Sequence, residues 1–361
     1  MQQQLWQPAD KPAKAAAGYA GIDYFRVVAA VFIIAIHTAP LKSFGDLPDY
    51  LITYCLGRIG VPFFFMVTGF FLSDIFFEKN RRSNNRLVRY GIRIAGVYLL
   101  AVLLYLPVNV YSGQIQMIIS AFFKNILFDG TFYHLWYFPA LLMGCMILYL
   151  LSRFAKPRLI TVIVLLGYLV GLGGDSYYGL VSEVTWLRNG YDFLFSISSY
   201  TRNGVFFAPV FLWMGACIAH YRPVPDRKQT GLGLLIGLIL LMIEGTLTYI
   251  AGWQRHNSMY LFLLPCMFFL FLCLLYNRKA SRRRLRDITA WIYLLHPICI
   301  ILVRAFARFF QMEELLINQS LVHFLMVCLF SFYFAVLAAN MTRLVKDYVN
   351  QKKEEREASG K

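Results

Sequence analysis

Ten apolar segments of roughly membrane-spanning length dominate this 361-residue sequence. They cover residues 22–40, 51–77, 91–110, 134–152, 158–174, 204–221, 231–252, 259–276, 288–310 and 320–342. A transmembrane helix needs about 20 predominantly apolar residues. Hydrophobic residues make up 59% of the chain and charged residues only 15%, whereas a soluble domain carries about 25% charged residues. The sequence therefore predicts an all-α polytopic membrane protein with about ten transmembrane helices.

The distribution of basic residues predicts the topology. Lysine and arginine gather in the loops that follow the second, fourth, sixth and eighth segments, above all in 78–89 and 277–286, while the intervening loops are mainly acidic or neutral. Because cytoplasmic loops are enriched in Lys and Arg, both termini are expected in the cytoplasm. We expect a cytoplasmic segment at 1–20, one transmembrane domain at 21–343 and a charged cytoplasmic tail at 344–361. The net charge of +16 then reflects topology, and no nucleic-acid partner is expected.

The seven cysteines all lie within predicted spans, and none has a Cys/His metal-binding spacing. We interpret them as small packing residues. No metal site is predicted.

Three ionisable residues in the first span, Asp23, Arg26 and His37, are the main candidates for chemistry. Ionisable groups in a membrane segment are costly and usually mark a functional site. Arg26 and His37 are eleven residues apart, so on one helix they lie within roughly 20° of the same face and about 16 Å apart along the axis. An imidazole titrates near neutral pH and can act as a general base, and Asp23 can orient Arg26. The alternative is an interfacial arginine and a histidine satisfied by a neighbouring helix.

Six further residues are candidates for substrate binding or for supporting the catalytic residues: Arg58, His134, Trp136, Arg202, Glu244 and His296. Pro297 follows His296 and removes a backbone donor, so we expect a local break that opens a polar pocket. Glu244 is a lone acid within a span and needs a partner, for which Arg58 and Arg255 are candidates. A structural role is the alternative for each residue.

Five motifs in order resemble those of the acyltransferase 3 family of integral-membrane acyltransferases. The first span has the Asp-x-x-Arg start at Asp23 and Arg26 and the Arg-x10-His signature that ends at His37. Segments 63–72, 134–138, 206–215 and 293–297 follow in the expected order, so the resemblance covers about residues 20–343. It implies a multi-pass protein of the bacterial plasma membrane. The implied reaction moves an acyl group, expected to be acetyl from acetyl-CoA, to a hydroxyl of a cell-envelope or small-molecule acceptor.

The resemblance also implies roles for individual residues. It places Arg26 and His37 in the catalytic centre and expects an Arg-x-x-Arg element that contacts the donor at the start of the third helix. Here the pattern differs, because Arg86 and Arg89 have that spacing but lie early, whereas Arg89 and Arg93 are four residues apart. All three are candidates for donor binding.

A closer resemblance is to the membrane module of vancomycin-resistance-type membrane serine racemases. It rests on segments 35–38, 61–66, 106–111, 128–131, 174–179 and 200–204. That module is usually proposed to bring L-serine to a fused racemase domain, for which we expect no counterpart in these 361 residues. Transport of L-serine or a similar small amino acid is therefore the alternative function, and a non-catalytic scaffold is a third. We prefer acyl transfer, because its catalytic signature is intact.

Overall fold

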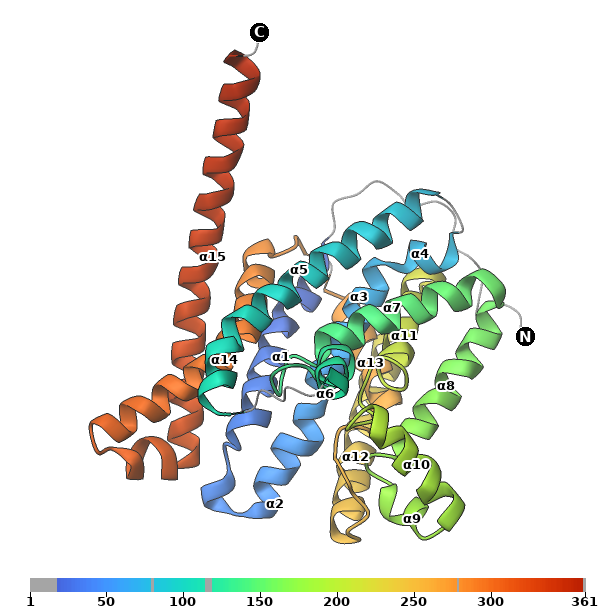
Figure 1. The fold of residues 1–361 in the computed structure, drawn as a ribbon. Helices are drawn as coiled ribbons and strands as arrows, with labels where there is room; N and C mark the ends of the chain where they lie inside the picture. Colours follow the sequence, from blue (N-terminus) through green and yellow to red (C-terminus); the bar gives the residue numbers. More distant parts are fainter. Residues whose placement is uncertain (1–17, 79–80, 114–118, 278, 360–361) are drawn as a thin grey trace. The chain divides into compact units, whose positions relative to one another are not determined.

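The computed structural model describes residues 18–78, 81–113, 119–277 and 279–359, and all regular secondary structure within them is helical (Figure 1). Seven helical segments are long and apolar enough to cross a membrane: Ala20–Thr38, Asp46–Phe71, Arg82–Tyr111, Tyr137–Phe154, Arg227–Ile250, Arg283–Phe309 and Ser320–Lys352. Three shorter apolar helices, α8 (Pro157–Gly173), α11 (Ala208–Tyr221) and α13 (Leu263–Leu275), coincide with the remaining predicted segments. The predicted all-α polytopic membrane fold is confirmed.

The contacts among described residues divide the chain into two compact units. The first contains Tyr54–Cys273, and the second combines Ala16–Thr53 with Leu274–Lys361. The second unit thus brings the first predicted span together with the last two.

Helix α11 forms the centre of the first unit. It is apolar on all sides and contacts α3 (Gly60–Phe71), α4 (Ser73–Phe77), α7 (Tyr137–Phe154) and α8. A helix that is hydrophobic all round is buried by its neighbours, and most α11 side chains are indeed buried. The unit also contains α5 (Arg81–Tyr111), α6 (Ile119–Lys124), α9 (Tyr178–Ser182), α10 (Thr185–Ile197), α12 (Arg227–Ile250) and most of α13.

Two glycines let α3 and α11 approach each other closely. A Cβ on Gly69 of α3 would overlap the backbone carbonyl of Leu212, and a Cβ on Gly215 of α11 would overlap the carbonyl of Met66. Small residues at a helix contact allow this backbone-to-backbone packing in membrane proteins. The pair fixes the register of the two helices.

The second predicted span, 51–77, is not one continuous α-helix. A π-helical turn (Tyr50–Cys55) and a 3₁₀ turn (Leu56–Ile59) precede α3, and Leu72 separates α3 from α4. Mid-helix π and 3₁₀ turns frequently mark functional sites. Arg58 lies in the 3₁₀ turn, where it is only 8% exposed.

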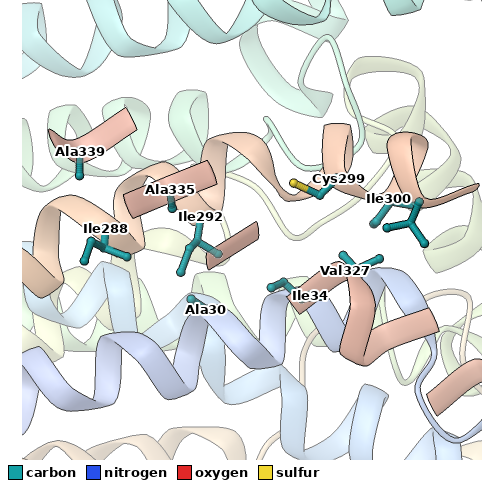
Figure 2. Close-up of a cluster of buried hydrophobic side chains, with 10 residues drawn as sticks. Ala30, Ile34, Ile288, Ile292, Cys299, Ile300, Val327, Ala335 and Ala339 are labelled. Carbon is teal, nitrogen blue, oxygen red and sulfur yellow. The ribbon is translucent and has the colours of Figure 1, made fainter. Parts of the chain in front are cut away.

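The core of the second unit lies where α1 (Ala20–Thr38), α14 (Arg283–Phe309) and α15 (Ser320–Ser359) meet (Figure 2). Ile292 of α14 points towards Ala30 of α1 in Figure 2, and Val327 of α15 belongs to the same cluster. Ala30 and Ile34 are four residues apart, as are Ile288 and Ile292, the spacing that places side chains on one helix face. Apolar stripes at helical period therefore hold the three helices together.

Helix α15 continues past its apolar part. Charged residues recur from Arg343 onwards, yet the helix runs to Ser359. Most of the predicted charged tail at 344–361 therefore continues the last span as a helix, and its final two residues lie outside the described part of the chain.

Candidate active site

Asp23 organises the N-terminal end of α1 in the second unit. Its carboxylate is 4% exposed. Oδ2 accepts hydrogen bonds from Ser281 Oγ at 2.8 Å and from the backbone N–H of Arg282, the residue before α14, at 2.7 Å. Oδ1 lies 3.6 Å from Arg26 Nε and 3.9 Å from Arg286 Nε. One buried carboxylate thus joins the starts of two helices and holds two guanidinium groups near it.

The predicted pairing of Asp23 with Arg26 is present in the structure. The two residues are one helical turn apart, and the Arg26 side chain is 15% exposed. The guanidinium points back towards the start of α1, as helical side chains generally do. His37 lies in the last turn of the same helix, about 16 Å further along the axis. Arg26 and His37 therefore occupy opposite ends of α1.

His37 and His296 stack on each other within the second unit. Their ring centroids are 5.3 Å apart and the ring planes meet at 23°. His37 is half-buried and His296 is fully buried. Two imidazoles that sequence reasoning proposed separately, one on α1 and one on α14, thus form one pair.

The predicted break at Pro297 is wrong, because α14 is continuous from Arg283 to Phe309. A proline lacks the N–H that would bond the carbonyl four residues earlier, here that of Tyr293. His296 Nδ1–H donates to this carbonyl at 3.0 Å and lies 3.2 Å from the Ile292 carbonyl. The side chain replaces the missing backbone donor, so the helix needs no break. Because Nδ1 carries the proton, Nε2 holds the lone pair in the neutral ring.

The three candidate donor-binding arginines lie on one face of α5 in the first unit. Arg86, Arg89 and Arg93 are three and four residues apart, and all are exposed. Arg86 is already engaged, since it donates at 2.6 Å to Asp74 and at 2.6 Å to the carbonyl of Phe71 at the end of α3. Arg89 donates to a backbone carbonyl of its own helix, that of Asn85, at 3.3 Å.

Arg58 and Arg202 lie in the first unit beside aromatic rings. Arg58 donates a hydrogen bond to Asn257 Oδ1, and its guanidinium lies 5.2 Å from the Tyr54 ring centroid. Arg202 lies 5.0 Å from the Trp136 ring and 4.5 Å from the Tyr200 ring. The structure therefore brings the predicted residues Arg202 and Trp136 together.

The loop before α13 carries a buried polar cluster that sequence reasoning missed. Asp175 is fully buried and accepts backbone N–H groups from Ser258 at 2.7 Å and Met259 at 2.9 Å. His256 Nδ1 lies 3.3 Å from its other oxygen. Burial alone would raise the pKa of Asp175, but His256 and the backbone donors outweigh it and lower the pKa. Burial and the charge of Arg202 lower the pKa of His256 to about 4, so this ring is neutral at physiological pH.

Glu244 anchors a loop, and neither of its proposed arginine partners contacts it among the described residues. Its carboxylate accepts from Tyr177 Oη at 2.7 Å and from the backbone N–H groups of Leu261 at 2.6 Å and Phe262 at 2.8 Å. The span α12 is thereby tied to the start of α13.

His134 lies just before α7. It is 2% exposed and contacts the rings of Tyr105, at 4.9 Å between centroids, and Phe132, at 5.7 Å. Among the residues that the structure describes, no three His, Cys, Asp or Glu side chains are arranged to hold a metal ion.

The candidates thus separate into two sets. The second unit holds Asp23, Arg26, His37 and His296, while the first unit holds the remaining candidates: Arg58, Arg86, Arg89, Arg93, His134, Trp136, Arg202 and Glu244. Within the described ranges, a basic side chain and an imidazole share one helix only in the second unit.

Comparison with known proteins identifies the family. Residues 19–340 match the acyltransferase 3 family model, described as an acyltransferase domain. The chain is 39% identical over 333 residues to a protein of Enterococcus faecalis named amino-acid racemase, an alignment that covers 90% of this chain and 47% of that protein. It is 35% identical over 321 residues to a serine/alanine racemase of Enterococcus gallinarum, with 88% of this chain and 45% of that protein covered.

The chain therefore spans about half the length of the curated relatives that it matches. No solved structure matches it significantly. The family match extends from just before Asp23 to the last span and includes both histidines of the stacked pair. With its apolar helices, this chain belongs to the acyltransferase 3 family of multi-pass membrane acyltransferases.

Proposed function

We propose that this protein moves an acyl group, expected to be acetyl, from acyl-CoA to a hydroxyl of a cell-envelope or small-molecule acceptor, with His37 as general base. The observation that carries the proposal is the His37–His296 stack at the opposite end of α1 from the Asp23–Arg26 pair. A neutral imidazole at His37 accepts the acceptor's hydroxyl proton as the oxygen attacks the thioester carbonyl. The carbon–sulfur bond then breaks, and the imidazolium returns the proton to the departing thiolate.

The separation of Arg26 from His37 assigns them different tasks in this proposal. About 16 Å of helix lies between the two residues, and Arg26 is directed to Asp23, away from His37. Arg26 is therefore suited to hold the charged part of an elongated donor rather than to stabilise charge that develops beside His37. A CoA donor carries phosphates at one end and its thioester at the other, which matches this arrangement. Arg89 and Arg93 belong to the first unit, and their contact with the donor stays a prediction from the family resemblance.

The test is acyl transfer from radiolabelled acetyl-CoA by purified protein in detergent, with hydroxyl-bearing acceptors and with water as the minimal acceptor. His37→Ala should abolish turnover, because general-base catalysis contributes about 10²–10⁴-fold. Arg26→Gln should chiefly raise KM for the donor. His220→Ala, a change at an exposed histidine at the end of α11, is the matched control and should retain activity. Equal turnover by wild type and a folded His37→Ala protein would remove the proposal.

A second candidate function is transport of L-serine or a similar small amino acid, with which the racemase names of the relatives are compatible. Proteoliposomes that contain the wild-type protein would then take up labelled L-serine faster than empty vesicles, and His37→Ala would abolish the difference. Uptake equal to that of empty vesicles would exclude this candidate.

A further inference from the structure

Two arginines of the first unit have no acidic partner among the residues that the structure describes. Arg58 is 8% exposed, and its one hydrogen bond to a described residue goes to the neutral side chain of Asn257. Arg202 Nε is buried and makes no hydrogen bond within the described part of the chain. No carboxylate among those residues lies within ion-pair distance of either guanidinium. An arginine carries five N–H donors, and buried arginines are normally paired.

The contacts of both arginines lead to the loop before α13. Asn257, which binds Arg58, is adjacent to His256 in sequence. The ring centroids of His256 and Tyr200 are 4.7 Å apart. The guanidinium carbon of Arg202 lies 4.5 Å from the Tyr200 ring centroid. The contacts of the two arginines therefore reach two adjacent residues of one loop, His256 and Asn257.

Like charge accumulates at this place. Burial, together with the positive charge of Arg58, lowers the pKa of Arg202 to about 10. Burial and the charge of Arg202 also keep His256 neutral, by lowering its pKa to about 4. The charges of Asp175 and Asp129 offset this effect on Arg202 in part. Among the described residues, however, neither guanidinium has a carboxylate at ion-pair distance.

The nearby carboxylates are already committed to backbone donors. Asp175 accepts from Ser258 and Met259, and Asp129 accepts from the backbone N–H of Ser199 at 2.9 Å. These acids hold the loops at Ser199 and Ser258, and neither lies within ion-pair distance of Arg58 or Arg202. An anion from outside the chain would supply the missing partner.

We propose that Arg58 and Arg202 form a binding site for a small ligand that bears an oxyanion, either a carboxylate or a phosphate group. Planar guanidinium groups bind such oxyanions through paired hydrogen bonds. The rings of Tyr54, Trp136 and Tyr200 hold the two arginines in place and offer apolar surface to the carbon portion of the ligand. The site belongs entirely to the first unit and involves neither His37 nor Arg26, so it does not depend on the acyl-transfer proposal.

The test uses binding alone. Purified full-length protein in detergent at pH 7.5 and constant ionic strength would be titrated with acetate, L-serine and inorganic phosphate, with chloride as the reference anion. Thermal midpoints and isothermal titration calorimetry would report binding. We expect saturable stabilisation by at least one of the three oxyanions. Binding of acetate or L-serine identifies a carboxylate ligand, and binding of phosphate alone identifies a phosphate-bearing one.

Variants separate a binding role from a structural one. Arg202→Gln and Arg58→Gln should each weaken oxyanion binding at least tenfold, about 1.4 kcal/mol. Arg202→Lys should bind the oxyanion more weakly than wild type, because lysine keeps the positive charge but lacks the planar guanidinium that forms paired hydrogen bonds. Arg255→Gln is the matched control and should bind normally. Arg255 is exposed in the same loop and donates to the Ser199 carbonyl at 2.8 Å.

The ligand-free thermal midpoint provides a second measurement. Removing an unpartnered cation beside another cation should leave the midpoint of Arg202→Gln unchanged or raise it. A lowered midpoint with unchanged oxyanion affinity would show that Arg202 is structural and would overturn the proposal. Failure of all three oxyanions to stabilise the wild-type protein beyond chloride would overturn it as well.

Discussion

Replacement of Glu244 by glutamine should destabilise the first unit without any ligand present. The carboxylate accepts three hydrogen bonds, from Tyr177 Oη at 2.7 Å, Leu261 N at 2.6 Å and Phe262 N at 2.8 Å. Glutamine offers one oxygen and one NH₂ group. If the glutamine oxygen takes the place of Oε1, its NH₂ group lies opposite the Phe262 N–H. Two hydrogen-bond donors then face each other at a residue that is only 5% exposed.

The expected cost follows from the bonds that change. Hydrogen bonds to a charged group contribute about 1.5–3 kcal/mol each, and neutral ones about 0.5–1.5 kcal/mol. Glu244→Gln loses one bond and weakens two, which predicts a loss of about 2–4 kcal/mol in the free energy of unfolding. Tyr177→Phe removes a single donor and leaves the carboxylate with two backbone partners, so it should cost only about 1–2 kcal/mol.

Reversible unfolding in mixed micelles with increasing SDS would measure these differences. Glu183→Gln is the control, because Glu183 is exposed and its replacement should change the free energy of unfolding by less than about 0.5 kcal/mol. A Glu244→Gln protein as stable as this control would refute the reasoning. Glu244 would then be available for ligand binding, the role that the sequence suggested.

Three other perturbations test separate features. As the pH falls from 6.5 towards 4, the wild-type protein should lose up to about 3 kcal/mol of stability that the His256→Gln variant does not lose. The reason is that the pKa of His256 in the folded protein, about 4, is below its ordinary value of 6.5, and each pKa unit is worth about 1.36 kcal/mol. Parallel stability–pH profiles for the two proteins would contradict this. Gly215→Ala should lower the stability of the protein by about 1–3 kcal/mol, because the new Cβ overlaps α3. At Gly231 a Cβ meets no atom within 4 Å, so Gly231→Ala should raise the stability by up to about 1 kcal/mol. A thermal or SDS unfolding assay would measure both changes. His296→Ala should cost about 1–3 kcal/mol of stability because it leaves a helix carbonyl without a hydrogen bond. Adding Pro297→Ala should restore stability because alanine supplies the backbone N–H. A double variant no more stable than His296→Ala would argue against the role of His296 as a replacement donor.

The sequence predicted the helices well because membrane spans are long apolar runs. All ten predicted segments correspond to helices of the structure or to the helical run at 46–77. The Asp23–Arg26 pair was also predictable, since its members are one turn apart on a single helix. The break around Arg58 was not, because the π and 3₁₀ turns occur within an otherwise apolar run.

The polar loop cluster could not be predicted for a different reason. Asp175 and Ser258 are 83 residues apart, and only the folded chain brings them together. His256 lies in a short polar stretch that resembles an ordinary connection between spans. His296 was predicted as a site residue, but its role in replacing the N–H that Pro297 lacks requires the backbone geometry. Local patterns thus predict helices and pairs within a helix, whereas partners from distant segments require coordinates.

Helix α15 contains 40 residues, which correspond to about 60 Å of continuous helix. The hydrocarbon layer is only about 30 Å thick, so roughly half of this rod must project beyond it. A rigid projection converts tilting within the membrane into sideways travel: a tilt of about 10° displaces the tip of an arm of about 30 Å by about 5 Å. Rearrangement among the helices that surround α15 would therefore displace the C-terminal end of α15 in the adjoining aqueous compartment.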